Sequence, residues 1–269
     1  MLQSAQKVFA PSPEYVFDDN QKNLAQLVGY VGLLMPVLLL VARSFSPNND
    51  CSYNSISHHY YAFLAGDIFV GSLFVIAAIV IFYKGKSRAE RWFTTLAGIF
   101  AIGVAIFPTD GSGCEQVEAF GRYFATFDSS ASGEGAIYAQ VPTFAALFEA
   151  TTFELTLFGY DVGLHYASAG LLFILLGLYC IFIFPQSDPK THQDHTGGWT
   201  ADKRRRNLAY YISAAVIFLS IFAIAAKPGF TIEEWDKLNL TFWFETFGLA
   251  AFGFSWLVRG RFVRFFGVK

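Results

Sequence analysis

Six apolar segments, each long enough to cross a lipid bilayer as a helix, recur along this chain and constrain its fold more than any other feature. A hydrocarbon core of about 30 Å needs roughly 20 helical residues. Because 54% of the residues are hydrophobic and only 15% are charged, an ordinary soluble domain is excluded. We therefore expect an all-α, polytopic membrane protein, a bundle of six transmembrane helices. The predicted spans are residues 23–41, 60–83, 92–107, 162–184, 208–226 and 238–258.

Polar segments divide the chain into three parts. Residues 1–22 form a polar amino-terminal arm, residues 23–258 the transmembrane domain, and residues 259–269 a basic tail. The transmembrane domain contains a long external loop at residues 108–160. Its last part, residues 141–158, is apolar but includes a proline and two glutamates. We expect this part to form an interfacial helix and not a seventh span.

The basic residues predict the orientation. Fifteen of the 19 Lys and Arg residues lie in the arm, the second loop, the fourth loop and the tail, which are all on one side of a six-span bundle. Because cytoplasmic loops retain Lys and Arg, both termini are expected in the cytoplasm and the protein in the inner (plasma) membrane. The basic residues form no single concentrated surface, so nucleic acid is not expected as a partner. The expected partners are the lipid bilayer and other membrane protein subunits.

Several ionisable residues fall near the outer ends of the predicted spans. His59 enters the second span from outside and Asp67 lies within it, Asp161 and His165 open the fourth, and Glu245 lies in the sixth. An ionisable side chain at membrane depth indicates a functional site. His59 and Asp67 differ by about 80° around a helix, and Asp161 and His165, four residues apart, would share one face. Small residues near Asp67 and Glu245 predict tight packing, with both carboxylates pointing into the bundle.

The chemistry of this site is open among three alternatives. His59 and His165 with Asp67, Asp161 or Glu245 form a donor set that suits zinc or another divalent metal. The same residues can instead satisfy one another in a wet outer vestibule without a metal. Haem ligated by His59 and His165 is a third alternative.

The three cysteines form no C-x-x-C motif. Cys180 falls inside an apolar span and is expected to be a core residue. Cys51 and Cys114 lie in two predicted external loops, where a disulfide can persist. We treat this pairing as a hypothesis, because spacing alone does not set the geometry that a disulfide needs.

Two resemblances follow from the histidine-bearing segment. Ser55, Ser57, His59 and Asp67 resemble the pattern of the membrane hydrolase superfamily that includes alkaline ceramidases and adiponectin-type receptors. That resemblance implies zinc held near one membrane face. The segments SISHHYYAFLAGDIFVG and FGFSWLVRG also resemble multi-pass membrane proteins of bacterial genomes whose activity is uncharacterised, and this resemblance implies no activity.

Three functions are compatible with these features. The first is a binding or accessory protein that takes a ligand, a lipid or a partner protein at the outer vestibule. The second is a metal-dependent hydrolase acting on lipid-like substrates, with His59, His165 and Asp67 as metal ligands and Glu245 as general base. The third is a proton-coupled transporter in which Asp67 and Glu245 relay protons.

Overall fold

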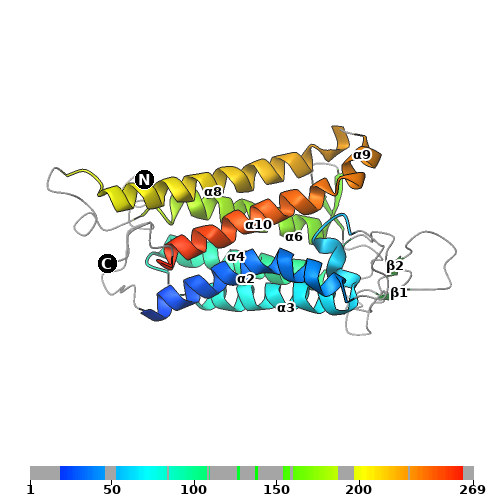
Figure 1. Cartoon of the computed structure of the whole chain (residues 1–269), viewed down its shortest axis with the longest axis horizontal. Coiled ribbons are helices and arrows are strands. Elements are labelled where there is room, and N and C mark those ends of the chain that lie inside the picture. Colours follow the sequence, from blue (N-terminus) through cyan, green and yellow to red (C-terminus); the bar gives the residue numbers. More distant parts are fainter. Residues whose placement is uncertain are drawn as a thin grey trace.

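The computed structural model shows a bundle of long helices (Figure 1). It describes residues 19–45, 53–83, 85–107, 109, 126–127, 137–138, 154–157, 160–186, 197–229 and 231–262.

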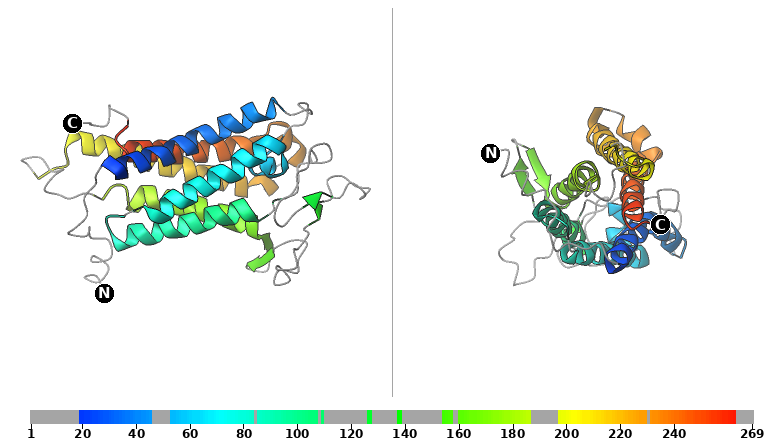
Figure 2. Two further views of the ribbon diagram at one scale, coloured as in Figure 1. Left: turned by 90° about the horizontal axis from the view of Figure 1, so that it is seen from below. Right: turned by 90° about the vertical axis from the view of Figure 1, so that its left-hand side faces the viewer.

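Six long helices pack side by side and form a closed ring. Each helix packs on the one before it and the one after it, and the last packs back on the first. The right-hand view of Figure 2 shows the ring end-on. Consecutive helices are antiparallel, so every second connection lies at the same end of the bundle. The helices are α2 (Asp19–Arg43), α3 (Phe63–Phe82), α4 (Arg88–Ile106), α6 (Leu164–Phe182), α8 (Ala201–Ala225) and α10 (Leu240–Arg259).

Five of these helices are long and apolar enough to cross a membrane, namely α2, α3, α4, α6 and α8. Helix α10 is 20 residues long but carries Glu245, and it is not among these five. Large apolar side chains cover the outside of the bundle, including Leu219 and Phe222, which are 65% and 72% exposed. Exposed apolar residues at this density suit a hydrocarbon environment. The chain is thus an integral membrane protein of mainly helical structure.

Three helices begin several residues before the predicted spans. Helix α2 starts at Asp19, α4 at Arg88 and α8 at Ala201, whereas the predicted spans begin at 23, 92 and 208. Ser87 caps α4 by accepting a hydrogen bond from the Glu90 amide, and Thr200 caps α8 in the same way. A helix ends where its backbone groups find other partners and not where its hydropathy changes.

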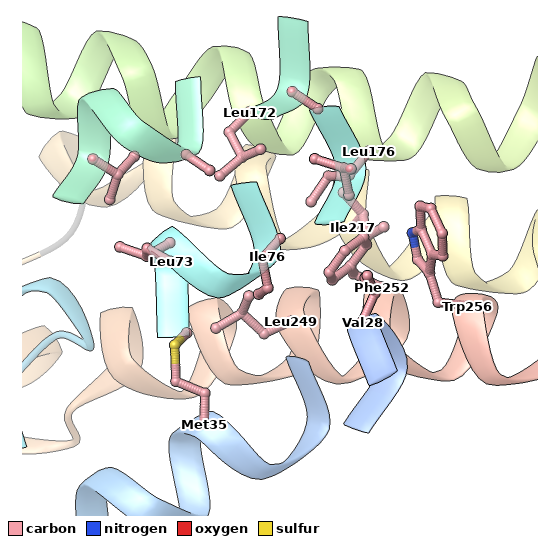
Figure 3. Packing of buried hydrophobic residues seen from close by; sticks show 14 of the residues in the cluster. Val28, Met35, Leu73, Ile76, Leu172, Leu176, Ile217, Leu249, Phe252 and Trp256 are labelled. Atoms are coloured by element: carbon pink, nitrogen blue, oxygen red, sulfur yellow. The ribbon is translucent and has the colours of Figure 1, made fainter. Parts of the chain in front are cut away.

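The helices bury one continuous apolar core (Figure 3). The labelled side chains of this core come from α2, α3, α6, α8 and α10, with Leu172 and Leu176 on α6. On one side of the ring, α2 and α10 approach so closely that a Cβ atom at Gly253 would lie 2.7 Å from the Gly29 carbonyl oxygen. Glycine at these positions lets the two backbones touch.

Short elements connect the helices at the end of the bundle where α3, α6 and α10 begin. They are the 3-10 helices η1 (Ser57–Tyr61) and η3 (Lys227–Gly229), the helix α9 (Ile232–Lys237), and two antiparallel pairs of strands. The strands are β1 (Thr126–Phe127) with β2 (Ile137–Tyr138), and β3 (Glu154–Leu157) with β4 (Tyr160–Gly163).

The hairpin β3–β4 corrects one prediction. Residues Glu154–Leu157 belong to the predicted interfacial helix, but they form a strand. The two residues between β3 and β4 include a glycine, which favours a tight hairpin, and the local pairing satisfies the backbone. The bundle itself is all-helical, as expected, and the strand pairs belong to its connections. The rest of the predicted interfacial helix lies outside the described residues.

Candidate functional site

His59 lies in η1, ahead of α3, at what we call the histidine end: the end of the bundle formed by η1 and the first turns of α3, α6 and α10. Its side chain is 1% exposed, and its ring lies 4.7 Å from that of Tyr53 and 6.1 Å from that of Phe242. Burial lowers the pKa of His59 to about 4, because a charged imidazole would lose its hydration. The ring is therefore neutral at pH 7.

The two ring nitrogens of His59 have different surroundings. Nδ1 lies 3.2 Å from the Ser55 carbonyl oxygen and 3.1 Å from the Ile56 carbonyl oxygen. A carbonyl oxygen only accepts, so Nδ1 carries the proton and donates. Nε2 then carries a lone pair. It is buried and forms no hydrogen bond with any residue that the structure describes.

Glu245 holds η1 on α10. The Ser55 hydroxyl donates to both carboxylate oxygens, at 3.0 and 2.8 Å, and the Ile56 amide donates to one of them at 2.6 Å. Ser55 and Glu245 are 190 residues apart in the chain. Both carboxylate oxygens thus stabilise the backbone that positions His59. The general-base role expected for Glu245 stays a prediction.

His165 is the second residue of α6 and is also 1% exposed. Its Nδ1 lies 3.0 Å from the Phe107 carbonyl oxygen, just past the end of α4. The hydroxyl of Tyr60, the residue after His59, donates at 3.0 Å to the adjacent carbonyl of Ile106. The end of α4 therefore ties the segments that carry both histidines together.

The structure places Asp67 away from this arrangement and Asp161 outside the helix that carries His165. Asp67 is exposed on the outside of α3, so the expectation that it points into the bundle is wrong. Asp161 lies in β4, paired with Thr156, whereas His165 lies in α6. The helix begins only at Leu164, so the four-residue helical spacing between Asp161 and His165 does not apply.

A three-ligand metal centre does not appear in the described part of the chain. No group of three or more His, Cys, Asp or Glu side chains there could hold a metal ion. A catalytic zinc usually has three protein ligands. The haem alternative rests on the two histidines and gains no further support.

Cys51 and Cys114 lie outside the described residues, so their disulfide stays a prediction. Cys180 is a buried free thiol, as expected.

The opposite end of the bundle contains a second buried polar cluster, centred on Glu90 of α4. We call this the basic end. Glu90 is fully buried, and its carboxylate accepts from the Tyr179 hydroxyl at 2.8 Å and from the Lys86 amide at 2.7 Å. An Arg259 guanidinium nitrogen lies 3.8 Å from it. Tyr179 stacks on Trp256 at 5.8 Å, which closes the cluster on the core side.

Two buried lysines extend this cluster. Lys86 and Lys203 are 6% and 2% exposed, and their ammonium groups donate to the carbonyls of Gln186 and Pro185. Burial lowers the pKa of Lys86 well below its usual value, and the nearby Arg259 adds to the effect. The cluster thus collects more positive than negative charge in a protected place.

The sequence interpretation missed this second cluster because it assigned Glu90 and Lys203 to polar loops. One available signal was the tetrapeptide Ser87-Arg88-Ala89-Glu90, which matches the capping-box pattern of a helix start. Recognising it would have placed Glu90 inside the first turn of a helix. It would not have predicted the contacts with Tyr179 and Arg259.

The fold and its apolar surface define the class of protein: an integral membrane protein of several helical spans. No protein-family model, curated protein or solved structure matches the chain.

Proposed function

We propose that this chain is a six-span binding protein of the inner (plasma) membrane that takes a ligand at the histidine end, on the outer side. The leading reading is a binding or accessory component and not an enzyme. One observation carries the proposal: the lone-pair nitrogen Nε2 of His59 is buried and forms no hydrogen bond within the described residues.

A buried acceptor of this kind is costly unless something occupies it. The neutral imidazole, with Nδ1 bound to backbone carbonyls, presents Nε2 either to a hydrogen-bond donor or to a metal ion. The carboxylate of Glu245 supports the site by holding Ser55 and Ile56. The ligand class is therefore a molecule with a donor group, or a divalent metal.

The orientation rests on charge. In a six-span arrangement α10 also crosses the membrane, and the connections at the basic end then lie in the cytoplasm with both termini. Lys86, Arg88, Lys203 and Arg259 all belong to that end, as expected for cytoplasmic loops. The histidine end and the long loop at 108–160 then face outside.

The second candidate function is a metal-dependent hydrolase. It is favoured by one observation, that His59 and His165 both direct Nδ1 at a backbone carbonyl. Metal-binding histidines are commonly oriented in this way. Such an enzyme needs a third ligand beyond the two histidines.

Native mass spectrometry of the protein purified from membranes tests the binding proposal. We expect an adduct on the wild type that is lost in His59→Ala and kept in His58→Ala, the matched control next to it. A bare wild-type mass, or an adduct that His59→Ala retains, would overturn the proposal. Elemental analysis of the same samples separates the two functions, because one zinc per chain lost in both His59→Ala and His165→Ala favours the hydrolase.

A further inference from the structure

The turn that carries His59 is fixed by a buried serine hydroxyl. Ser55 is 5% exposed, and its hydroxyl donates to the carboxylate of Glu245, with oxygen–oxygen distances of 3.0 and 2.8 Å. The same hydroxyl oxygen accepts a hydrogen bond from the Ser57 amide at 3.1 Å. A hydroxyl has one proton and two lone pairs, so both contacts can form at once. The Ser55 side chain therefore links α10 to the first residue of η1.

These contacts orient two peptide groups of the turn. The first joins Ser55 to Ile56; its N–H donates to Glu245 at 2.6 Å, and its carbonyl lies 3.2 Å from Nδ1 of His59. The second joins Ile56 to Ser57; its N–H donates to the Ser55 hydroxyl, and its carbonyl lies 3.1 Å from the same nitrogen. In a planar trans peptide group the N–H and the C=O point in opposite directions. Fixing each N–H therefore directs each carbonyl at His59.

A further contact with α10 holds the same segment. The Phe242 amide, in the first turn of α10, donates at 2.8 Å to the Asn54 carbonyl. The Phe242 ring lies 6.1 Å from the ring of His59. Helix α10 thus anchors the turn and provides one wall for the imidazole.

We propose that Ser55 is the positioning residue of the histidine site. Its hydroxyl, held by Glu245, orients the turn whose two carbonyls keep the proton of His59 on Nδ1, and so makes Nε2 an acceptor. The hydrogen bond of one ring nitrogen decides which state the other presents to a ligand. Without the Ser55 hydroxyl, the ring can place its proton on Nε2, which then rejects a donor group or a metal ion. This role rests on the proposed binding at Nε2, but the tautomer can be measured without a ligand.

Heteronuclear NMR of the full chain, isotope-labelled at the histidine ring nitrogens and purified in detergent at neutral pH, measures the tautomer. Protonated and unprotonated ring nitrogens resonate at different frequencies, and the His59 signals are assigned by their loss in His59→Ala. We expect a protonated Nδ1 and an unprotonated Nε2 in the wild type, and a mixture of both tautomers in Ser55→Ala. In native mass spectra, Ser55→Ala should retain the wild-type adduct about tenfold less, as for the loss of a hydrogen bond to a charged group.

Three further variants separate the hydroxyl from the packing of the side chain. Ser55→Thr keeps a hydroxyl and should show the single wild-type tautomer. Ser213→Ala removes a serine hydroxyl that is 2% exposed in the middle of α8, and it should leave the His59 signals unchanged. If Ser55→Ala does not fold, Ser55→Cys has a similar volume and a weaker donor, and it should show both tautomers.

The role of Ser55 and the proposed function fail in different ways. A single wild-type tautomer in Ser55→Ala and Ser55→Cys would overturn the role of Ser55. A mixture in Ser55→Thr, or a wild type with the proton on Nε2, would overturn it as well. A wild type without an adduct would instead overturn the proposed function, whatever the tautomer of His59.

Discussion

His59 is held in a single tautomer by two backbone carbonyls and is kept neutral by burial. Its ring lies tilted against the rings of Tyr53 and Phe242 and is buried, so water does not solvate a charged form. The carboxylate of Glu245 on α10 accepts a hydrogen bond from the Ile56 amide in the same turn, although the two residues are 189 positions apart in the chain. At the scale of single residues, Nε2 of His59 is thus a pre-arranged hydrogen-bond acceptor, in contrast to that of a flexible surface histidine.

This burial predicts a pH dependence of stability. The pKa of His59 is 6.5 in the unfolded chain and about 4 in the folded protein, so the unfolded state binds the proton first as the pH falls. The contribution of neutral His59 to the free energy of unfolding is fully present above about pH 6.5. It falls by up to about 1.4 kcal/mol per pH unit as the pH decreases toward 4. His59→Asn keeps an amide donor for the carbonyls but does not titrate, so this part of the pH dependence should disappear.

The measurement is the thermal unfolding midpoint of the detergent-purified protein at several pH values from about 7.5 to 4.5, across the interval in which His59 titrates. His58→Asn serves as control and should retain the wild-type profile. Identical profiles for the wild type and His59→Asn would show that His59 is not buried in this way.

At the scale of elements, the contact between α2 and α10 closes the ring. Gly29 and Gly253 face each other there, and a side chain at either position would meet the backbone of the other helix. At Gly71 of α3, in contrast, a Cβ atom would have no neighbouring atom within 4 Å. These glycines therefore have different roles although all three lie inside apolar helices.

Gly253→Ala is expected to destabilise the protein by about 1–3 kcal/mol, because the two helices must separate to admit the methyl group. Gly71→Ala should cause no loss, since its methyl group enters open space and alanine favours a helix. Thermal unfolding in detergent compares the two variants with the wild type. A Gly253→Ala protein as stable as Gly71→Ala would contradict the close approach of α2 and α10.

At the scale of the whole molecule, the ring has two chemically different ends. The histidine end carries the neutral imidazole of His59 and a carboxylate that binds a backbone donor, whereas the basic end carries two buried lysines and the partly buried Arg259 near Glu90. A six-span arrangement places these ends on opposite sides of the membrane. The proposed binding site at the histidine end would then face the outer compartment.

Reporter fusions test this arrangement and the crossing of α10. A reporter that fluoresces only in the cytoplasm should be active after Lys269, and a phosphatase active only outside should work when inserted after Gly229, between α8 and α10. The Lys and Arg residues at the basic end favour this result, because cytoplasmic loops retain such residues. If the fluorescent reporter were active both after Gly229 and after Lys269, α10 would not cross the membrane. If the phosphatase were active after Lys269, the orientation would be the reverse of the one proposed.

Much of the fold could be predicted from hydropathy. The six apolar runs correspond to the six long helices, and most of their ends agree within a few residues. The exceptions are the polar first turns of α2, α4 and α8. For α4 and α8, a capping side chain and not hydropathy decides where the helix starts. Asp161 was misplaced for a related reason, since a helical spacing was applied to residues that form a strand.

The candidate site was only partly predictable. His59, His165 and Glu245 were expected at one end and do lie there, because each position follows from its place along a span. The exposure of Asp67 was not foreseen, since the helix face that points inward depends on neighbouring helices. The cluster of Glu90, Tyr179 and Arg259 was missed because its members come from three separate helices.

The amino-acid sequence alone establishes that this chain resides in a membrane, roughly where its helices run and at which end His59 and His165 lie. These properties depend on the local transfer of side chains from water to hydrocarbon, which a linear pattern records. The packing of the helices was needed to show that Glu245 holds η1, that Asp67 faces outward and that Glu90 is buried against Tyr179. Those contacts join residues far apart in the chain, and the closing of the helical ring alone brings them together.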